Sequence, residues 1–93
     1  MTEHWYVYVL VSTVAVRTYV GIAKDPDERL EAHNGIRPGG AKATRGWRPW
    51  KIGRLYGPID SKGEALRLEL RIKKEVGPDR LLVEWDPVAT TKE

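Results

Sequence analysis

The segment Trp5 to Gly21 constrains the fold more than any other part of the sequence. Trp5 to Val11 is apolar or aromatic at every position, which is typical of a β-strand covered on both faces. Arg17 to Ile22 is rich in β-branched and aromatic residues and predicts a second strand. Because the connection, Ser12 to Val16, is too short for a crossover helix, the two strands are expected to pair antiparallel.

Tyrosines recur in this predicted hairpin. Side chains alternate between the two faces of a strand, so Tyr6 and Tyr8 share one face of the first strand. By the same rule Arg17 and Tyr19 share one face of the second. If these faces coincide, the phenols gather on one side, and Gly21 leaves room for another group to approach the backbone. The alternative is an ordinary strand, in which tyrosine is common.

Two helices are predicted from their start signals. Residues 25–28 combine an N-cap aspartate, a proline for the first helical position and a capping-box glutamate. This helix should end at His33 or Asn34, before Gly35. Arg29 lies one turn before His33, so the two side chains project from the same face.

A second capping box, Ser61 to Glu64, predicts a helix that ends near Val76. Trp50 to Tyr56 is expected to be a third strand between the two helices. Asp79 to Trp85 fits either a short helix or a strand. A single domain over residues 1–86 is expected, followed by a frayed tail over residues 87–93.

One carboxylate is misplaced in the second helix. Spacing predicts an apolar stripe made of Ala65, Leu66, Leu68, Ile72 and Val76. Glu69 falls inside this stripe, where a carboxylate is costly unless it is paired, protonated or bound to a metal. Two interpretations stay open: a salt bridge to Lys73, one turn on, or a metal ligand at the edge of a cleft.

Charge and composition narrow the class of protein. The chain has no cysteine, which excludes disulfides, zinc fingers and thiol catalysis and suits a cytoplasmic protein. No apolar run is long enough to span a bilayer, so no membrane partner is expected. Of the 16 basic residues, six lie in a segment without any acidic residue, which leaves 10 basic against 13 acidic residues elsewhere. The six are Arg37, Lys42, Arg45, Arg48, Lys51 and Arg54.

This basic segment also contains Trp47, Trp50 and several glycines. Basic side chains attract a polyanion, and aromatic rings stack on bases, so the segment predicts nucleic-acid binding. The chain thus combines this basic segment with tyrosines, an Arg/His helix face and a glutamate in an apolar stripe. These are the kinds of group that phosphodiester hydrolysis requires. Tyrosine is a poor base at its ordinary pKa of about 10, and serves as one if nearby cations favour the phenolate.

The sequence resembles the GIY-YIG nucleases over Trp5 to about Lys74. Tyr6-Val7-Tyr8 stands for the family's Gly-Ile-Tyr, and Tyr19-Val20-Gly21 for its Tyr-Ile-Gly, with ten residues between Tyr8 and Tyr19. The glycine-rich basic loop, residues 39–46, is similar to that of the small stand-alone bacterial members. These in turn are similar to the nuclease domain of the endonuclease that cuts branched DNA. The chain departs from the family in having Tyr6 at the first glycine position.

The resemblance implies a fold, a site and a function. The fold is a small α/β (α+β) domain with a three-stranded antiparallel sheet flanked by helices. The catalytic residues are Tyr8, Tyr19, Arg29, His33 and Glu69, with Glu69 as the ligand of one Mg²⁺ or Mn²⁺. The nucleic-acid contacts are Arg37, Lys42, Arg45, Arg48 and Lys73, and Tyr6 and Gly21 support the site. Tyr8 or Tyr19 takes the proton of the attacking water, directly or through His33.

The expected function is a metal-dependent DNA endonuclease, structure-specific in repair or recombination. The first alternative is a nucleic-acid-binding module on the same fold that no longer cuts. The second is a small protein-interaction domain with Trp47, Trp50 and Trp85 as an adhesive patch. The choice between DNA and RNA, the form of the substrate, and a monomer or a homodimer all stay open.

Overall fold

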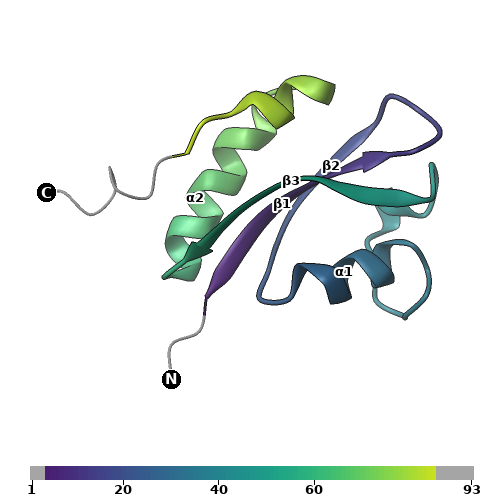
Figure 1. Ribbon diagram of the computed structural model, residues 1–93, viewed down its shortest axis with the longest axis horizontal. Coiled ribbons are helices and arrows are strands. Elements are labelled where there is room, and N and C mark those ends of the chain that lie inside the picture. Colours follow the sequence, from purple (N-terminus) through teal and green to yellow (C-terminus); the bar gives the residue numbers. More distant parts are fainter. Residues whose placement is uncertain (1–3, 86–93) are drawn as a thin grey trace, which may run out of the picture.

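A computed structural model describes residues 4–85 of the chain. It contains a three-stranded antiparallel sheet in the order β2-β1-β3, with helices on both faces (Figure 1). The elements in chain order are β1 (Trp5–Ser12), β2 (Thr18–Ala23), α1 (Pro26–His33), the 3₁₀ turn η1 (Lys42–Thr44), β3 (Trp50–Ile59), α2 (Lys62–Lys73) and the 3₁₀ helix η2 (Gly77–Leu82). The predicted hairpin and fold class are therefore confirmed.

The central strand β1 is buried on both faces, as its apolar sequence predicts. Val7 and Val9 are fully buried in a cluster with α2, which lies on one side of the sheet. Tyr8 and Leu10 belong to a second cluster, against which Leu30 of α1 packs. Helix α1 lies on the opposite side of the sheet from α2 (Figure 1). Strand alternation thus divides the core into an α2 face and an α1 face.

Both helices begin where their capping residues predict. Asp25 accepts a hydrogen bond from the backbone N–H of Glu28, and Ser61 accepts one from that of Glu64, each at 3.1 Å. Helix α1 ends at His33, as expected. Side-chain capping of the first turn is a local signal, and this explains why the sequence reveals it.

Helix α2 ends at Lys73, earlier than the sequence predicts. Val76 has an extended backbone and is 79% exposed, because the chain turns there into η2. Leu66 is also exposed, so the predicted stripe is wrong at these two positions. The buried face of α2 consists of Ala65, Leu68 and Ile72.

The sequence left open whether residues 79–85 form a short helix or a strand. They form the later part of the 3₁₀ helix η2 and an extended segment after it. Tyr56 donates a hydrogen bond from its hydroxyl to the carbonyl of Val83, and Arg54 donates one to that of Leu81. Strand β3 also runs to Ile59, beyond the predicted end at Tyr56, and includes Gly57-Pro58. An edge strand tolerates such a proline, because its outward side needs no hydrogen bond.

Residues 87–93, predicted to be a frayed tail, lie outside the described residues. Among residues 4–85, no helix is both long and apolar enough to cross a membrane.

Candidate active site

Strand register places the two family tyrosines on the same face of the sheet. Tyr19 lies directly opposite Leu10, and Gly21 lies opposite Tyr8. Leu10 and Tyr8 are two residues apart on β1, so all of these positions face α1. The expectation that phenols gather on one side is confirmed for Tyr8 and Tyr19.

Gly21 makes room for Tyr8 itself. A Cβ atom built on Gly21 would overlap the hydroxyl end of the Tyr8 ring. The group expected to approach this backbone is thus the phenol of the partner strand. Tyr6 lies further along β1, with its ring against Gly57.

His33 is fully buried between the two tyrosines and a loop. The centroid of its ring is 5.8 Å from that of Tyr8 and 4.9 Å from that of Tyr19. Its Nε2 atom lies 2.9 Å from the Tyr8 hydroxyl, and its Nδ1 atom lies 2.9 Å from Oγ1 of Thr44. The Thr44 hydroxyl in turn donates a hydrogen bond to the carbonyl of Ala41, at 2.8 Å.

Electrostatics keep both partners of this hydrogen bond neutral. Burial lowers the pKa of His33 to about 4, and the positive charges of Arg29 and Arg48 add to the effect. Burial raises the pKa of Tyr8 above its ordinary value, although the Arg29 guanidinium acts in the opposite direction. The condition that nearby cations favour the phenolate is met in direction by Arg29, but desolvation of the buried Tyr8 ring outweighs it and the pKa is raised.

Arg29 lies at the open side of this cluster. Its Nη1 atom donates a hydrogen bond to the carbonyl of Gly39 at 3.0 Å, which orients the guanidinium. Arg29 lines a hollow of about 220 Å³ together with Glu28, Ala32, Arg37 and Pro38. The charge of Arg29 lowers the pKa of both His33 and Tyr8, so its guanidinium lies within electrostatic range of both groups.

Glu69 is 14% exposed, and its Oε2 atom lies 3.2 Å from Nζ of Lys73. The salt bridge considered from the sequence is thus present. Glu69 also acts on Tyr8: after burial, Arg29 and Tyr19, its charge is among the causes that set the pKa of that phenol. Helices α2 and α1 cover opposite faces of the sheet, so Glu69 acts on Tyr8 through its charge and its direct contact is with Lys73.

The basic segment between α1 and β3 divides into free and engaged side chains. Lys42 and Arg45 are exposed, and neither forms an ion pair with another residue in the range 4–85. Arg37 is paired with Glu31 at 2.7 Å and with Glu28 at 3.5 Å. Lys42 and Arg45 are therefore the predicted nucleic-acid contacts that remain free to meet a phosphate.

Arg48 and Trp50 have structural contacts that the sequence did not predict. Arg48 donates a hydrogen bond from Nε to the carbonyl of His33, at the end of α1. Trp50 is 4% exposed and belongs to the core beside Tyr8. The proposal that Trp50 stacks on bases, or joins an adhesive surface patch, is therefore wrong, whereas Trp47 is 47% exposed.

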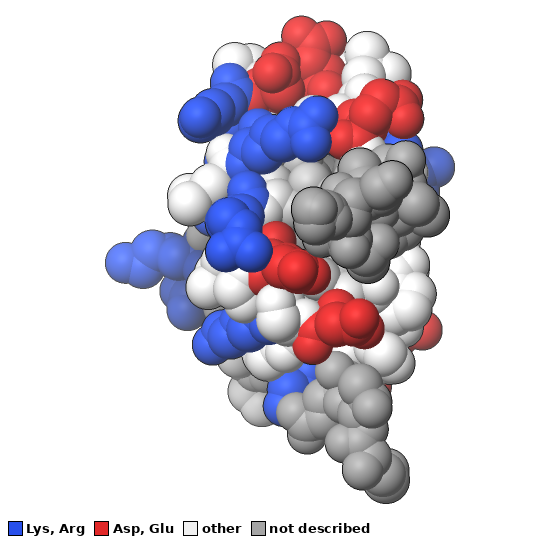
Figure 2. Space-filling model, turned by 90° about the vertical axis from the view of Figure 1, so that its left-hand side faces the viewer, with Lys and Arg blue, Asp and Glu red and all other residues white. Residues whose placement is uncertain are grey.

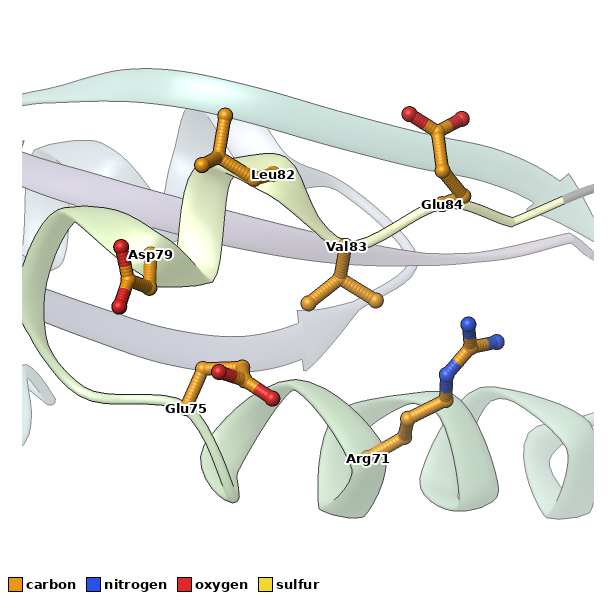
Figure 3. A pocket seen from close by; sticks show the side chains of 6 residues that line it. All are labelled: Arg71, Glu75, Asp79, Leu82, Val83 and Glu84. Atoms are coloured by element: carbon orange, nitrogen blue, oxygen red, sulfur yellow. The ribbon is translucent and has the colours of Figure 1, made fainter.

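The surface around α2 differs in its charges from the basic segment between α1 and β3. On the side shown in Figure 2, acidic and basic side chains are intermixed, in contrast to the acid-free basic segment. A pocket of about 370 Å³ lies between α2 and the chain that follows it (Figure 3). Its charged side chains are Arg71, Glu75, Asp79 and Glu84. Three carboxylates against one guanidinium are unfavourable for a phosphate, and no predicted site residue lines this pocket.

A sequence model of the GIY-YIG catalytic domain matches residues 4–81. The chain belongs to the GIY-YIG family. This match confirms the resemblance and covers Tyr8, Tyr19, Arg29, His33 and Glu69. The matched model describes a catalytic domain, which agrees with the prediction of a GIY-YIG enzyme.

Individual GIY-YIG relatives fall into two groups. The chain is 38% identical over 73 residues to a UPF0213 protein of Aeromonas hydrophila, covering 78% of this chain and 51% of the relative. It is 38% identical over 72 residues to a UPF0213 protein of Neisseria meningitidis, covering 77% and 75%. It is 43% identical over 51 residues to structure-specific endonuclease subunit slx1 of Schizosaccharomyces pombe, covering 55% and 19%. The chain thus spans about half of the Aeromonas protein and a small part of the yeast subunit.

Proposed function

We propose that this GIY-YIG protein is a metal-dependent endonuclease that hydrolyses phosphodiester bonds in DNA. The observation that carries the proposal is the hydrogen bond between the Tyr8 hydroxyl and Nε2 of the fully buried His33. A phenol in contact with a neutral imidazole can accept a proton, because it can pass its own proton to the imidazole. Arg29 and Glu69, whose charges both act on the pKa of Tyr8, supply the charges that phosphoryl transfer requires.

The proton route follows from the contacts of Tyr8. A water molecule attacks the phosphorus, and its proton moves to the Tyr8 oxygen while the Tyr8 proton moves to Nε2 of His33. The P–O3′ bond breaks, which leaves a 5′-phosphate and a 3′ oxygen that takes a proton from solvent. Tyr8 ends neutral and His33 ends as an imidazolium. This route replaces the phenolate, which the raised pKa of Tyr8 disfavours.

Arg29 stabilises the charge that develops on the phosphorane. Its guanidinium is fixed by the carbonyl of Gly39 and lines the hollow beside α1. A cation held in place before the reaction costs no reorganisation when charge develops. The ring of Tyr19 packs against that of His33 at an interplanar angle of 55°. The Tyr19 hydroxyl has no hydrogen-bond partner among residues 4–85, so we assign it to contact with water or phosphate.

Glu69 fits the role of ligand for Mg²⁺ or Mn²⁺. A largely buried carboxylate is a suitable oxygen donor, and Mg²⁺ commonly binds one or two carboxylates while water and phosphate complete its shell. No group of three or more His, Asp or Glu side chains suited to a metal occurs within residues 4–85, which fits a cation shared with the substrate. When bound, the cation stabilises charge on the leaving oxygen.

Lys42 and Arg45, which form no ion pair within the described part of the chain, bind the DNA backbone next to the scissile phosphate. Such contacts are sequence-independent and position the substrate. We further propose structure-specific cleavage in DNA repair or recombination, because the yeast relatives carry the name of structure-specific endonuclease subunits. RNA remains an alternative substrate. One set of catalytic residues per chain cuts one strand, so cutting both strands requires a second copy or a second event.

The test uses labelled flaps, junctions, duplexes and single strands, each with Mg²⁺, Mn²⁺ or EDTA. We expect cleavage with a divalent cation, most rapid on a branched substrate, and no cleavage in EDTA. Glu69→Gln should still bind DNA but cleave slower by on the order of 10²-fold or more, since the lost stabilisation is several kcal/mol. Glu75→Gln, at an exposed position beyond the same helix, is the control and should cleave normally.

The free energy of unfolding of Glu69→Gln measures what the ion pair with Lys73 contributes. Because Lys73 is half exposed, loss of the ion pair should lower the free energy of unfolding by less than about 1 kcal/mol. A Glu69→Gln protein that cleaves at the wild-type rate would contradict the metal assignment. Tight DNA binding by the wild-type protein without cleavage under any cation would indicate a module that binds without cutting.

A further inference from the structure

We propose that Thr44 is a positioning residue that selects the tautomer of His33 in which Nε2 accepts the Tyr8 proton. This inference rests on the proposed function, because the selected tautomer matters only if Tyr8 and His33 exchange a proton. Thr44 lies 11 positions after His33, in a loop to which no catalytic residue is assigned. Its assignment follows from the donors and acceptors in one buried chain of contacts.

The Thr44 hydroxyl has a single proton, which it donates to the carbonyl of Ala41 at 2.8 Å. Its oxygen therefore faces Nδ1 of His33 with lone pairs only, at 2.9 Å. A favourable contact requires Nδ1 to carry the proton of the neutral ring. Nε2 is then an acceptor, and the Tyr8 hydroxyl donates to it at 2.9 Å.

The other tautomer is disfavoured by the same contacts. With the proton on Nε2, the bare Nδ1 would face the Thr44 oxygen, and two acceptors would meet in a site where both residues are fully buried. Tyr8 would then receive a hydrogen bond from His33 instead of donating one. Nε2 would have no free lone pair for the Tyr8 proton, so the proposed transfer would be blocked.

The loop holds Thr44 against α1 with several further contacts. Thr44 closes the turn η1, where its backbone N–H donates to the carbonyl of Ala41 at 3.1 Å. Its own carbonyl accepts a hydrogen bond from Nε1 of the buried Trp50 at 2.9 Å. A Cβ atom on Gly40 would collide with the carbonyl of Ala32, so this glycine permits the close approach of loop and helix. Gly40 and Trp50 thus help to hold Thr44 in its place against α1.

The first measurement is the tautomer of His33 in the wild-type protein, from ¹⁵N chemical shifts and long-range ¹H–¹⁵N correlations. The chain has two histidines, so His33 is readily distinguished from the exposed His4. We expect a neutral ring with the proton on Nδ1 at pH 7. A proton on Nε2 would overturn the inference. This result does not depend on cleavage, so it separates failure of the inference from failure of the proposed nuclease function.

The second measurement compares Thr44→Val with Thr44→Ser. Valine keeps the shape without the hydroxyl, and we expect kcat to fall by on the order of 10-fold to 10²-fold with little change in KM, together with a change in the ¹⁵N pattern of His33. Serine keeps the hydroxyl and should retain the tautomer and most of kcat. Thr18→Val is the matched control, because it also removes a threonine hydrogen bond to a carbonyl, that of Gly77, away from His33.

Two outcomes of this comparison would overturn the inference. One is a folded Thr44→Val protein with wild-type kcat and an unchanged ¹⁵N pattern. The other is an equal loss of kcat in Thr18→Val, which would reduce Thr44 to a general structural role. If Thr44→Val does not fold, the wild-type tautomer and the Thr44→Ser protein still decide the matter: an altered tautomer in Thr44→Ser would count against it.

Discussion

Tyr8 and Tyr19 lie on the same face of the sheet but have different partners. The Tyr8 hydroxyl is buried against His33, whereas that of Tyr19 has no hydrogen-bond partner among residues 4–85. A change to phenylalanine therefore has different consequences at the two positions. The sequence alone does not distinguish the two tyrosines, so either could be the group that takes the proton of the attacking water.

We predict that Tyr8→Phe abolishes cleavage and destabilises the fold, while Tyr19→Phe leaves stability nearly unchanged. Tyr8→Phe leaves a buried acceptor on His33 without its donor, which costs about 1–3 kcal/mol. Tyr19→Phe should change the free energy of unfolding by less than about 0.5 kcal/mol. Urea unfolding and cleavage assays on both variants check this. Equal stability of the two variants would argue against the hydrogen bond between Tyr8 and His33.

Gly21 provides a second prediction for a single residue. Gly21→Ala should destabilise the protein by about 1–3 kcal/mol and reduce cleavage, because the new methyl group displaces the Tyr8 ring from His33. Gly46→Ala is the matched control, since a Cβ atom there meets no atom within 4 Å. Thermal unfolding of both variants is the measurement. If Gly21→Ala were as stable and active as Gly46→Ala, the close packing of Tyr8 on β2 would be wrong.

At the level of elements, the connection from α1 to β3 combines two tasks. Thr44, within this connection, and Trp50, at the start of β3, are buried and hold the loop against the site. The exposed residues of the connection include Lys42 and Arg45, which have no ion pair within residues 4–85, and the half-exposed Trp47, whose ring centroid lies 4.8 Å from the guanidinium carbon of Arg17. In the proposed function this one segment both contacts the DNA backbone and packs beside the tyrosine cluster.

We predict that the free and the paired cations of this loop differ in their contribution to DNA binding. For duplex DNA, Lys42→Ala and Arg45→Ala should each reduce the slope of log K against log salt by about 0.9. Arg37→Ala should change the slope less, because Glu28 and Glu31 already neutralise Arg37. Lys74→Ala, an exposed position at the end of α2, is the control. Unchanged slopes for Lys42→Ala and Arg45→Ala would mean that this loop does not face DNA.

For the whole molecule, the buried neutral His33 makes stability depend on pH. The pKa of His33 is lowered to about 4 in the folded protein, against about 6.5 in the unfolded chain. As pH falls below 6.5, the unfolded chain takes up a proton that the folded protein excludes, so stability falls until pH approaches 4. The groups that face His33 are Tyr8, Tyr19, Arg29 and Arg48.

We predict a loss of about 2 kcal/mol in the free energy of unfolding between pH 7 and pH 5 from His33 alone. Urea unfolding at several pH values in this range measures it, above the range in which most carboxylates titrate. His33→Gln should flatten the profile, whereas His4→Gln, at an exposed position, should not. A profile that is flat for the wild-type protein would contradict a buried neutral His33.

The sequence by itself determined the strands, the starts of both helices and the family. These depend on signals within a few positions, such as caps, periodicity and the two tyrosine tripeptides. The helix end at Lys73 was missed because Val76 continues the apolar spacing, while the chain turns away there. The ion pair between Glu69 and Lys73 was one of two interpretations of the sequence, and only the structure showed that it forms.

Only the tertiary structure decided that Gly21 accommodates Tyr8, that Trp50 is buried and that Thr44 contacts His33. It also decided that burial, rather than nearby cations, governs the pKa of Tyr8. None of these contacts has a spacing rule in the sequence. Each joins segments that meet across the sheet or through a loop, and desolvation depends on everything packed around a group, so these features exist only once the chain is folded.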